Sequence, residues 1–224
     1  MSFDGLELSA IRVSAQVMAL ATLLCIVVGT TLAWYIARSG RRVAALLSAL
    51  ALLPLVIPPS AVGYYLLYAF GRQSTFGNFL IDDVGLRLVF TWPGAAIAAG
   101  VVSLPLFVRT AQAGFEQIDP ELLAVASTMA SPFRAFVRVA LPLAWPALVA
   151  ATLIAAARSL GEFGATVIIA GNIPGETQTV PAAIYDAVQA GDRPRANALA
   201  FFSLVFGLVV LAGLSLVLQR QRYR

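Results

Sequence analysis

The chain alternates long apolar segments with short polar ones, and the apolar segments indicate the architecture. They fall at about 13–37, 43–70, 88–109, 143–170 and 197–218. Each exceeds the roughly 20 residues that an α-helix needs to cross a ~30 Å hydrocarbon core. The pattern predicts an all-α integral membrane protein with five spanning helices, built as a single transmembrane domain over residues 1–224.

The composition fits a lipid bilayer as the environment. Hydrophobic residues make up 60% of the chain and charged residues 12%, whereas soluble domains carry roughly 45–50% and about 25%. The basic residues are all arginine, histidine is absent, and the single cysteine, Cys25, lies inside an apolar segment. This inventory argues against a structural zinc site and a disulfide framework, and we expect no metal.

The arginines are unevenly divided between the two sides of the membrane. With the N-terminus outside, nine of them are cytoplasmic: Arg38, Arg41, Arg42, Arg109, Arg134, Arg138, Arg220, Arg222 and Arg224. The outer segments hold five arginines: Arg12, Arg72, Arg87, Arg193 and Arg195. The same segments also hold seven acidic residues. This is the positive-inside bias, which predicts an outer N-terminus and a cytoplasmic C-terminus. It also explains the net charge of +4 without nucleic-acid binding.

Two predicted spans contain prolines. Pro54, Pro58 and Pro59 interrupt the second segment, and Pro105 lies in the third. Proline removes a backbone donor and kinks a helix, which lipid tolerates only where neighbouring groups satisfy the freed carbonyl. Each bend is either needed for helix packing or lies beside a transport pathway.

The segment 110–142 is too polar to span the membrane and too long for a simple connector. Asp119 before Pro120 and Ser131 before Pro132 each combine a capping side chain with a proline in the first helical position. We therefore expect two short amphipathic helices at the cytoplasmic surface.

The second of these helices carries an apolar face. Its spacing puts Phe133, Phe136 and Val137 on one side, and Arg134 and Arg138 on another. Such helices either rest on the membrane interface or dock a soluble partner.

The loop resembles the EAA loop of ABC importer permeases. Its last residues, "VALP" (139–142), match the family's Ile-x-Leu-Pro ending. With the family spacing, Leu123-Ala124-Val125 stands at the Glu-Ala-Ala position. With a one-residue deletion after Met129, Ala124-Val125-Ala126 stands there instead. The family's turn glycine is absent in both registers.

Other segments are similar to the molybdate/tungstate branch of these permeases. They are "LPLVIPPSAVGYYLLYAFGR" (53–72), "VSLPLFVR" (102–109) and "ARSLGEFGATVIIAGNIPGETQTVPAAIYDAVQAGD" (157–192). Sulfate and thiosulfate permeases share the "LGEFGA" region and are the near alternative. The resemblance implies a five-helix type I ABC importer permease fold with an EAA-type coupling helix pair, in a bacterial or archaeal plasma membrane.

The resemblance also implies partners. Such permeases pair, here as a homodimer, and bind two cytoplasmic ABC ATPase subunits and an external substrate-binding protein. ATP and Mg²⁺ would bind on the ATPases, because this chain has no lysine and no Gly-x4-Gly-Lys-Ser/Thr loop. We therefore expect a transport subunit rather than an enzyme, with no cofactor of its own.

The same resemblance assigns the contact with the ATPase to the loop 110–142. Within it, the helix 132–138 would dock, with Phe133 and Phe136 as apolar anchors and Arg134 as a polar contact. The coupling residues expected in full are Ala124, Ala126, Phe133, Arg134, Phe136, Leu141 and Pro142.

Arg158 and Glu162 are charged residues inside the fourth apolar segment. An arginine at the centre of a membrane helix costs about 2.5–3.5 kcal/mol on insertion scales. Four residues apart in one helix, the two side chains can pair. A stripe of small residues beside them, Ala157, Gly161 and Ala165, permits close helix approach. The pair either fixes helix register or lies on the oxyanion path.

Thr177, Gln178 and Thr179 follow the fourth segment on the outer side. They are either part of an ordinary solvated connector, or an entrance for the anion or a contact for the binding protein.

Two other function classes are possible. A channel or secondary transporter usually carries ionisable residues along several helices or repeated halves, and this chain shows neither. A membrane scaffold would not need the proline-capped helix pair.

Overall fold

The computed structural model describes residues 5–129 and 131–222, and its regular elements over these ranges are helices. Four helical segments are long and apolar enough to cross a membrane: Gly5–Arg38, Trp92–Glu116, Pro132–Leu160 and Arg193–Leu216. A bent pair of helices, Arg41–Val56 and Pro59–Phe70, would make a fifth span. The all-helical membrane fold is confirmed, although several helix limits differ from those expected.

The first span is one continuous helix that is longer than its apolar run. It consists of α1 (Gly5–Leu24), a π-helical turn η1 (Cys25–Gly29) and α2 (Thr30–Arg38). At Gly29 a Cβ atom would lie 2.4 Å from the ring of Phe107, so any side chain there would collide with α6. Glycine therefore lets the first span lie directly against α6.

The second apolar run is not a single rod. The helices α3 (Arg41–Val56) and α4 (Pro59–Phe70) meet at an angle of 106°. Ile57 and Pro58 between them have extended backbones with ψ of 136° and 134°, as residues before proline prefer. Pro59 then occupies the first turn of α4. The bend expected from the prolines is confirmed and breaks the helix outright.

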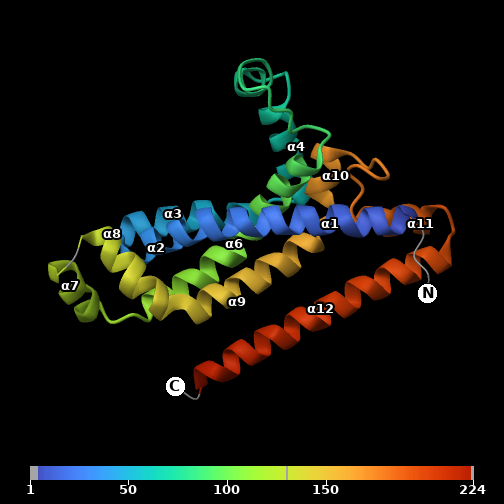
Figure 1. Ribbon diagram of the computed structural model, residues 1–224. Coiled ribbons are helices and arrows are strands. Elements are labelled where there is room, and N and C mark those ends of the chain that lie inside the picture. Colours follow the sequence, from blue (N-terminus) through green and yellow to red (C-terminus); the bar gives the residue numbers. More distant parts are fainter. Residues whose placement is uncertain (1–4, 130, 223–224) are drawn as a thin grey trace.

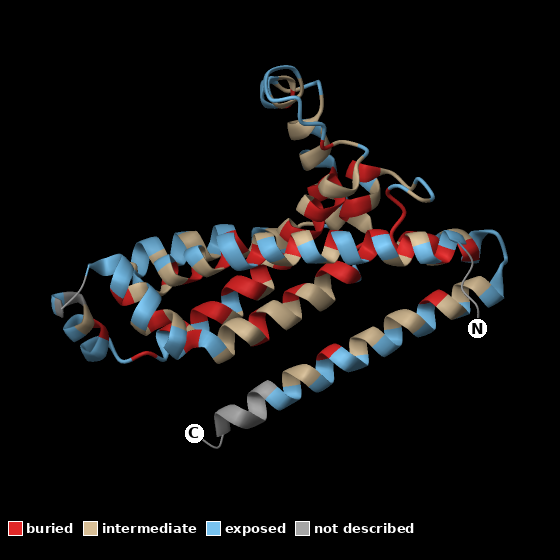
Figure 2. Cartoon of the chain, in the orientation of Figure 1, coloured by how far each residue is buried: buried red, intermediate tan, exposed pale blue. Residues whose placement is uncertain are grey.

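A short arm follows α4 and leads to the central helix. It contains α5 (Thr75–Asn78) and η2 (Phe79–Asp83). The helix α6 (Trp92–Glu116) begins four residues later than expected and continues past 109. The Thr91 hydroxyl accepts a hydrogen bond from the Gly94 N–H at 3.3 Å, which fixes that start. Most of α6 is buried (Figure 2).

The segment 110–142, which we expected to be a cytoplasmic loop with two short helices, contains one separate helix. The helix α7 (Pro120–Met129) is separate, as expected. The next elements, α8 (Pro132–Ala135), the π-helical turn η3 (Phe136–Ala140) and α9 (Leu141–Leu160), form one continuous helix of 29 residues. The expected boundary between a short surface helix and a span at residue 143 is therefore wrong. The caps were predicted correctly, since the hydroxyl of Ser131 accepts from Arg134 N–H and the Asp119 carboxylate from Glu121 N–H.

The fourth apolar run is also broken. Helix α9 ends at Leu160, and α10 (Gly164–Ala170) begins after three non-helical residues. One continuous span over 143–170 is therefore a wrong prediction, as is the stripe of Ala157, Gly161 and Ala165 along a single helix. Two further helices complete the chain: α11 (Val180–Gln189) and α12 (Arg193–Arg222).

The long helices lie side by side along one axis (Figure 1). The N-terminus and α11 lie at one end; the end of α2, α7, α8 and the C-terminus lie at the other. This arrangement places the arginine-rich segments 38–42 and 134–138 at the same end as the C-terminus. The side chains of Arg220, Arg222 and Arg224 are outside the described part. Helices α4 and α10 leave the bundle together on one side.

Candidate functional site

Glu162 lies in the break between α9 and α10, where its carboxylate makes two contacts. Its Oε2 atom lies 2.7 Å from Nη1 of Arg158, and its Oε1 accepts a hydrogen bond from Ala165 N–H at 2.9 Å. The predicted pairing is confirmed, but it links the last turn of one helix to the start of the next. The Glu162 carboxylate therefore satisfies a backbone N–H in the first turn of α10 and also pairs with Arg158, while Phe163 occupies the N-cap position.

The two members of the pair differ in exposure. The Glu162 side chain is 2% exposed, whereas that of Arg158 is 30% exposed. Glu162 is thus enclosed by the protein, and the guanidinium keeps an open side. A guanidinium has five N–H donors, so one contact with Glu162 leaves donors for another anion.

The break at Glu162 meets the break between α3 and α4. A Cβ atom on Gly164 would lie 3.3 Å from Pro59 Cβ and 3.4 Å from Ser60 N. A Cβ atom on Gly63 would lie 2.6 Å from the carbonyl oxygen of Ala165, so the first turns of α4 and α10 touch through glycine. In Figure 1 the two helices run together away from the bundle. The sequence alone did not reveal this crossing, because the two glycines are 101 positions apart.

Irregular backbone at membrane depth is tolerated only inside protein or beside a water-filled cavity. The two helix breaks lie next to each other, and the Arg158–Glu162 pair lies at one of them. The N-terminus of α4, which is the positive end of its helix dipole, lies at the other. A partly exposed guanidinium beside a helix N-terminus is chemically suited to contact an anion, and the Glu162 carboxylate balances the charge of Arg158.

The end of the bundle opposite to the N-terminus carries exposed apolar side chains on α7 and α8. Leu122 is 47%, Val125 58% and Phe133 74% exposed. Arg134 and Pro142 are also exposed, and Ala124 lies on the surface beside the half-buried Ala126. Together α7 and α8 form the outermost part of this end (Figure 1).

Phe136 and Leu141, which we expected to contact the ATPase, pack against the protein's own core. Phe136 is half-buried and packs on Trp34 and Phe115, with ring centroids 5.1 and 6.2 Å away. The prediction that Phe133, Phe136 and Val137 share one face is therefore wrong for Phe136, which packs on the core while Phe133 and Val137 are exposed. Leu141 also packs against the core. Both residues hold the helix to the bundle.

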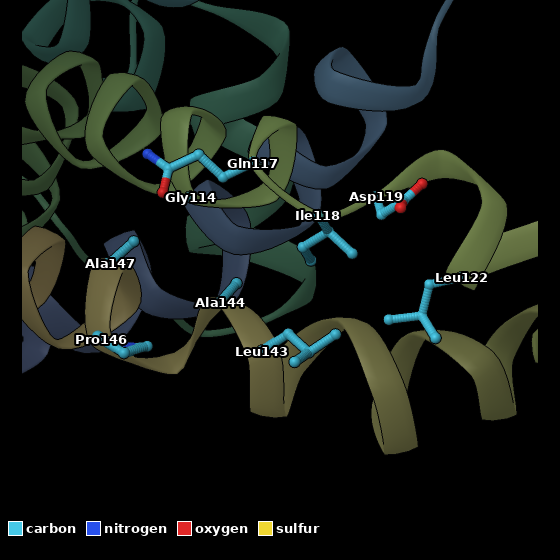
Figure 3. Close-up of a pocket in the computed structure, with 9 residues that line it drawn as sticks. All are labelled: Gly114, Gln117, Ile118, Asp119, Leu122, Leu143, Ala144, Pro146 and Ala147. Atoms are coloured by element: carbon cyan, nitrogen blue, oxygen red, sulfur yellow. The ribbon is translucent and has the colours of Figure 1, made fainter. Parts of the chain in front are cut away.

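An open pocket of about 280 Å³ lies beside this end, between the last turn of α6, the start of α7 and the start of α9. Ile118, Leu122 and Leu143 line it with apolar groups, and Asp119 stands at its edge (Figure 3). This groove therefore joins three elements, α6, α7 and α9, at the end of the bundle opposite to the N-terminus.

The three polar residues that we expected in an outer loop are buried within the chain. Thr177, Gln178 and Thr179 are only 2–4% exposed. The Thr177 hydroxyl accepts from Ile173 N–H at 3.1 Å, and the Gln178 amide donates to Asp186 at 2.8 Å. In this conformation these side chains fold the loop instead of facing solvent. The exposed residues of the loop are Ile173, Pro174 and Glu176.

The sequence matches a known family over nearly its whole length. Residues 9–223 match the model of the binding-protein-dependent transport system inner membrane component. The chain belongs to this family.

Its similarity to curated permeases is close. It is 40% identical to the molybdenum transport system permease protein ModB of Escherichia coli K12, over 92% of this chain and 90% of that protein. It is 40% identical to ModB of Azotobacter vinelandii, over 93% and 92%. The sulfate transport system permease protein CysT of Salmonella typhimurium is 35% identical, over 87% and 70%.

Solved structures agree on the fold. A bacterial ABC transporter involved in the import of alginate matches with a TM-score of 0.71 at 16% identity, over 97% of this chain and 80% of that one. An amino acid ABC transporter matches with a TM-score of 0.64 at 16% identity, over 98% and 100%. The permease therefore has the ABC importer permease fold and is a multi-pass membrane transport subunit, not an enzyme. Family membership disfavours the channel, secondary-transporter and scaffold alternatives.

Proposed function

We propose that this permease imports molybdate, or the closely similar tungstate, into the cytoplasm. The observation that carries the proposal is the 40% identity to molybdenum permeases of distant bacteria over more than nine-tenths of the chain. The sulfate permease relative is less similar at 35% and is the second candidate. Both anions are tetrahedral and doubly charged, so the same arginine can contact either one.

The partners follow from the fold. A homodimer of the permease would bind two cytoplasmic ATPases and an external binding protein; a solved relative is an alginate ABC transporter in complex with a periplasmic protein. ATP and Mg²⁺ would bind on the ATPases. The ends of the bundle support an outer N-terminus, because the arginine-rich segments lie opposite to it.

The ATPase would dock at the end formed by α7 and α8. Leu122, Val125 and Phe133 supply exposed apolar contacts there, and Arg134 supplies a charged one. ATP binding brings the ATPases together, and the docked helices move with them as rigid bodies. Phe136 and Leu141 are omitted from the docking face because they are packed inside.

The anion would pass the crossing of α4 and α10. Arg158 has an open side there, and Glu162 holds the guanidinium in the empty state. An arriving oxyanion would bind the donors that Glu162 leaves free, and repulsion from the nearby carboxylate would keep this contact transient instead of tight. The outer entrance for the anion would be formed by the loop that carries Ile173 and Glu176. The buried residues Thr177, Gln178 and Thr179 would hold this loop in place.

Substrate choice is tested by uptake in cells that lack their own molybdate and sulfate permeases. We expect cells with this permease, its ATPase and its binding protein to accumulate labelled molybdate, with little competition from excess sulfate. Preferential accumulation of labelled sulfate would assign the permease to the second candidate function.

A further inference from the structure

Three aromatic rings from three helical segments meet at the cytoplasmic end of the bundle. Trp34 belongs to α2, Phe115 to the last turn of α6, and Phe136 to η3. The ring centroids of Trp34 lie 5.3 Å from those of Phe115 and 5.1 Å from those of Phe136. Phe115 is fully buried, and the guanidinium of Arg38 lies over Trp34 at 5.2 Å. We call these three residues the aromatic cluster.

The cluster lies between the proposed docking helices and the spans. Phe136 is three residues after Phe133, which is 74% exposed. Along the same helix the direction of the side chain therefore changes from solvent to core within one turn. Leu123 of α7 and Ala135 of α8 are buried as well, so a displacement of α7 and α8 reaches the body of the protein through these two side chains and Phe136.

The helix is irregular at this point. Phe136 is the first residue of the π-helical turn η3, and Trp34 follows the π-helical turn η1 by five residues. Such turns interrupt the regular α-helical hydrogen bonds and are common sites of bending. Without side-chain contacts across it, η3 would absorb part of a movement that begins in α8.

The neighbouring helices already form one unit. A Cβ atom on Gly114 would lie 2.2 Å from Cβ of Ala147, which shows how closely α6 and α9 approach. Gly29 and Phe107 show the same for the first span and α6. Closely packed protein interiors deform little. A displacement of α6 would therefore also displace α9 and the first span.

We propose that the aromatic cluster transmits the movement of α7 and α8 to α2 and α6, and that Phe136 is a positioning residue for the coupling of ATP hydrolysis to transport. This inference rests on the proposed function. It separates two phenylalanines of one helix: Phe133 binds the ATPase, and Phe136 passes the movement on.

The test uses the purified complex of permease, ATPase and binding protein in proteoliposomes, and measures molybdate imported per ATP hydrolysed. In Phe136→Ala we expect the ATPase to remain bound and active, while this ratio falls about fivefold or more. In the matched variant Phe133→Ala we expect weaker ATPase binding and an unchanged ratio in the complexes that remain. An unchanged ratio in Phe136→Ala would overturn the inference.

A second pair of variants guards against simple misfolding. Phe136→Leu keeps apolar volume without the ring, and we expect an intermediate ratio. The second variant combines Trp34→Cys and Phe136→Cys with Cys25→Ala, which removes the native thiol. We expect the two new cysteines to lower the number of molybdate ions imported per ATP, and a short thiol cross-linker between them to restore it. A cross-linked complex that binds the ATPase but stays uncoupled would contradict the role of the cluster. A wild-type complex that hydrolyses ATP without importing molybdate would instead refute the proposed function.

Discussion

At the scale of single residues, the Arg158–Glu162 pair explains how charge is accommodated in an apolar protein. Glu162 is almost fully enclosed, and its two oxygens are used by Arg158 and by the backbone of Ala165. A buried charge is tolerated when it is paired and hydrogen-bonded. Arg158 is the less enclosed partner. It is therefore the member of the pair that can exchange partners.

We predict that Arg158→Gln lowers molybdate uptake about 10- to 100-fold, the loss expected for one hydrogen bond to a charged group. Glutamine still donates to Glu162, so the complex should assemble. The matched control is Arg72→Gln, because Arg72 forms an exposed ion pair with Asp82 at 3.2 Å. We expect this control to transport normally. Loss of assembly in Arg158→Gln, with normal uptake per remaining complex, would show that the pair only fixes helix register.

At the scale of helices, close approach through small residues holds the bundle together. Gly29, Gly63 and Gly114 each stand where a Cβ atom would come within 2.6 Å of a neighbouring element. Without a hydrophobic force between helices in lipid, such packing is a main source of association. The contact between α4 and α10 also sets the position of the ion pair.

We predict that Gly114→Ala destabilises the permease by about 1–3 kcal/mol, the usual cost of overpacking. The reason is the 2.2 Å approach between the added methyl group and Ala147. Gly207→Ala in α12 is the matched control, since nothing lies within 4 Å of its Cβ position. We expect thermal unfolding in detergent at a lower temperature for the first variant only. Equal unfolding temperatures would contradict the proposed packing of α6 on α9.

The helix content was predictable from apolar length, but the helix ends were not. The caps at Asp119 and Ser131 are local signals, and both were correct. The break after Leu160 could not be predicted, because Gly161 is compatible with a continuous membrane helix. The hydrogen bond that Glu162 accepts from Ala165 N–H depends on a turn that sequence spacing does not reveal. The orientation of Phe136 was missed because it depends on Trp34 and Phe115, which are distant in the chain.

At the scale of the whole molecule, a single chain leaves much apolar surface exposed. The described side chains of helix α12 are largely exposed (Figure 2). Helix α4 carries the exposed side chains of Tyr64, Tyr65 and Tyr68. Lipid covers some of this surface, and the proposed second copy of the permease would cover more. Helices α7 and α8 lie at the opposite end of the bundle from α11 (Figure 1). In the proposed complex, the movement of the ATPases would therefore travel along the helices.

The most direct test of ATP-driven import is uptake of labelled molybdate into proteoliposomes that contain the complete complex, with the binding protein outside and ATP enclosed. We predict accumulation that requires enclosed ATP and the binding protein, and that is lost in large part in Arg158→Gln. Uptake that continues without ATP would show a passive pathway and contradict the assignment as a coupled importer.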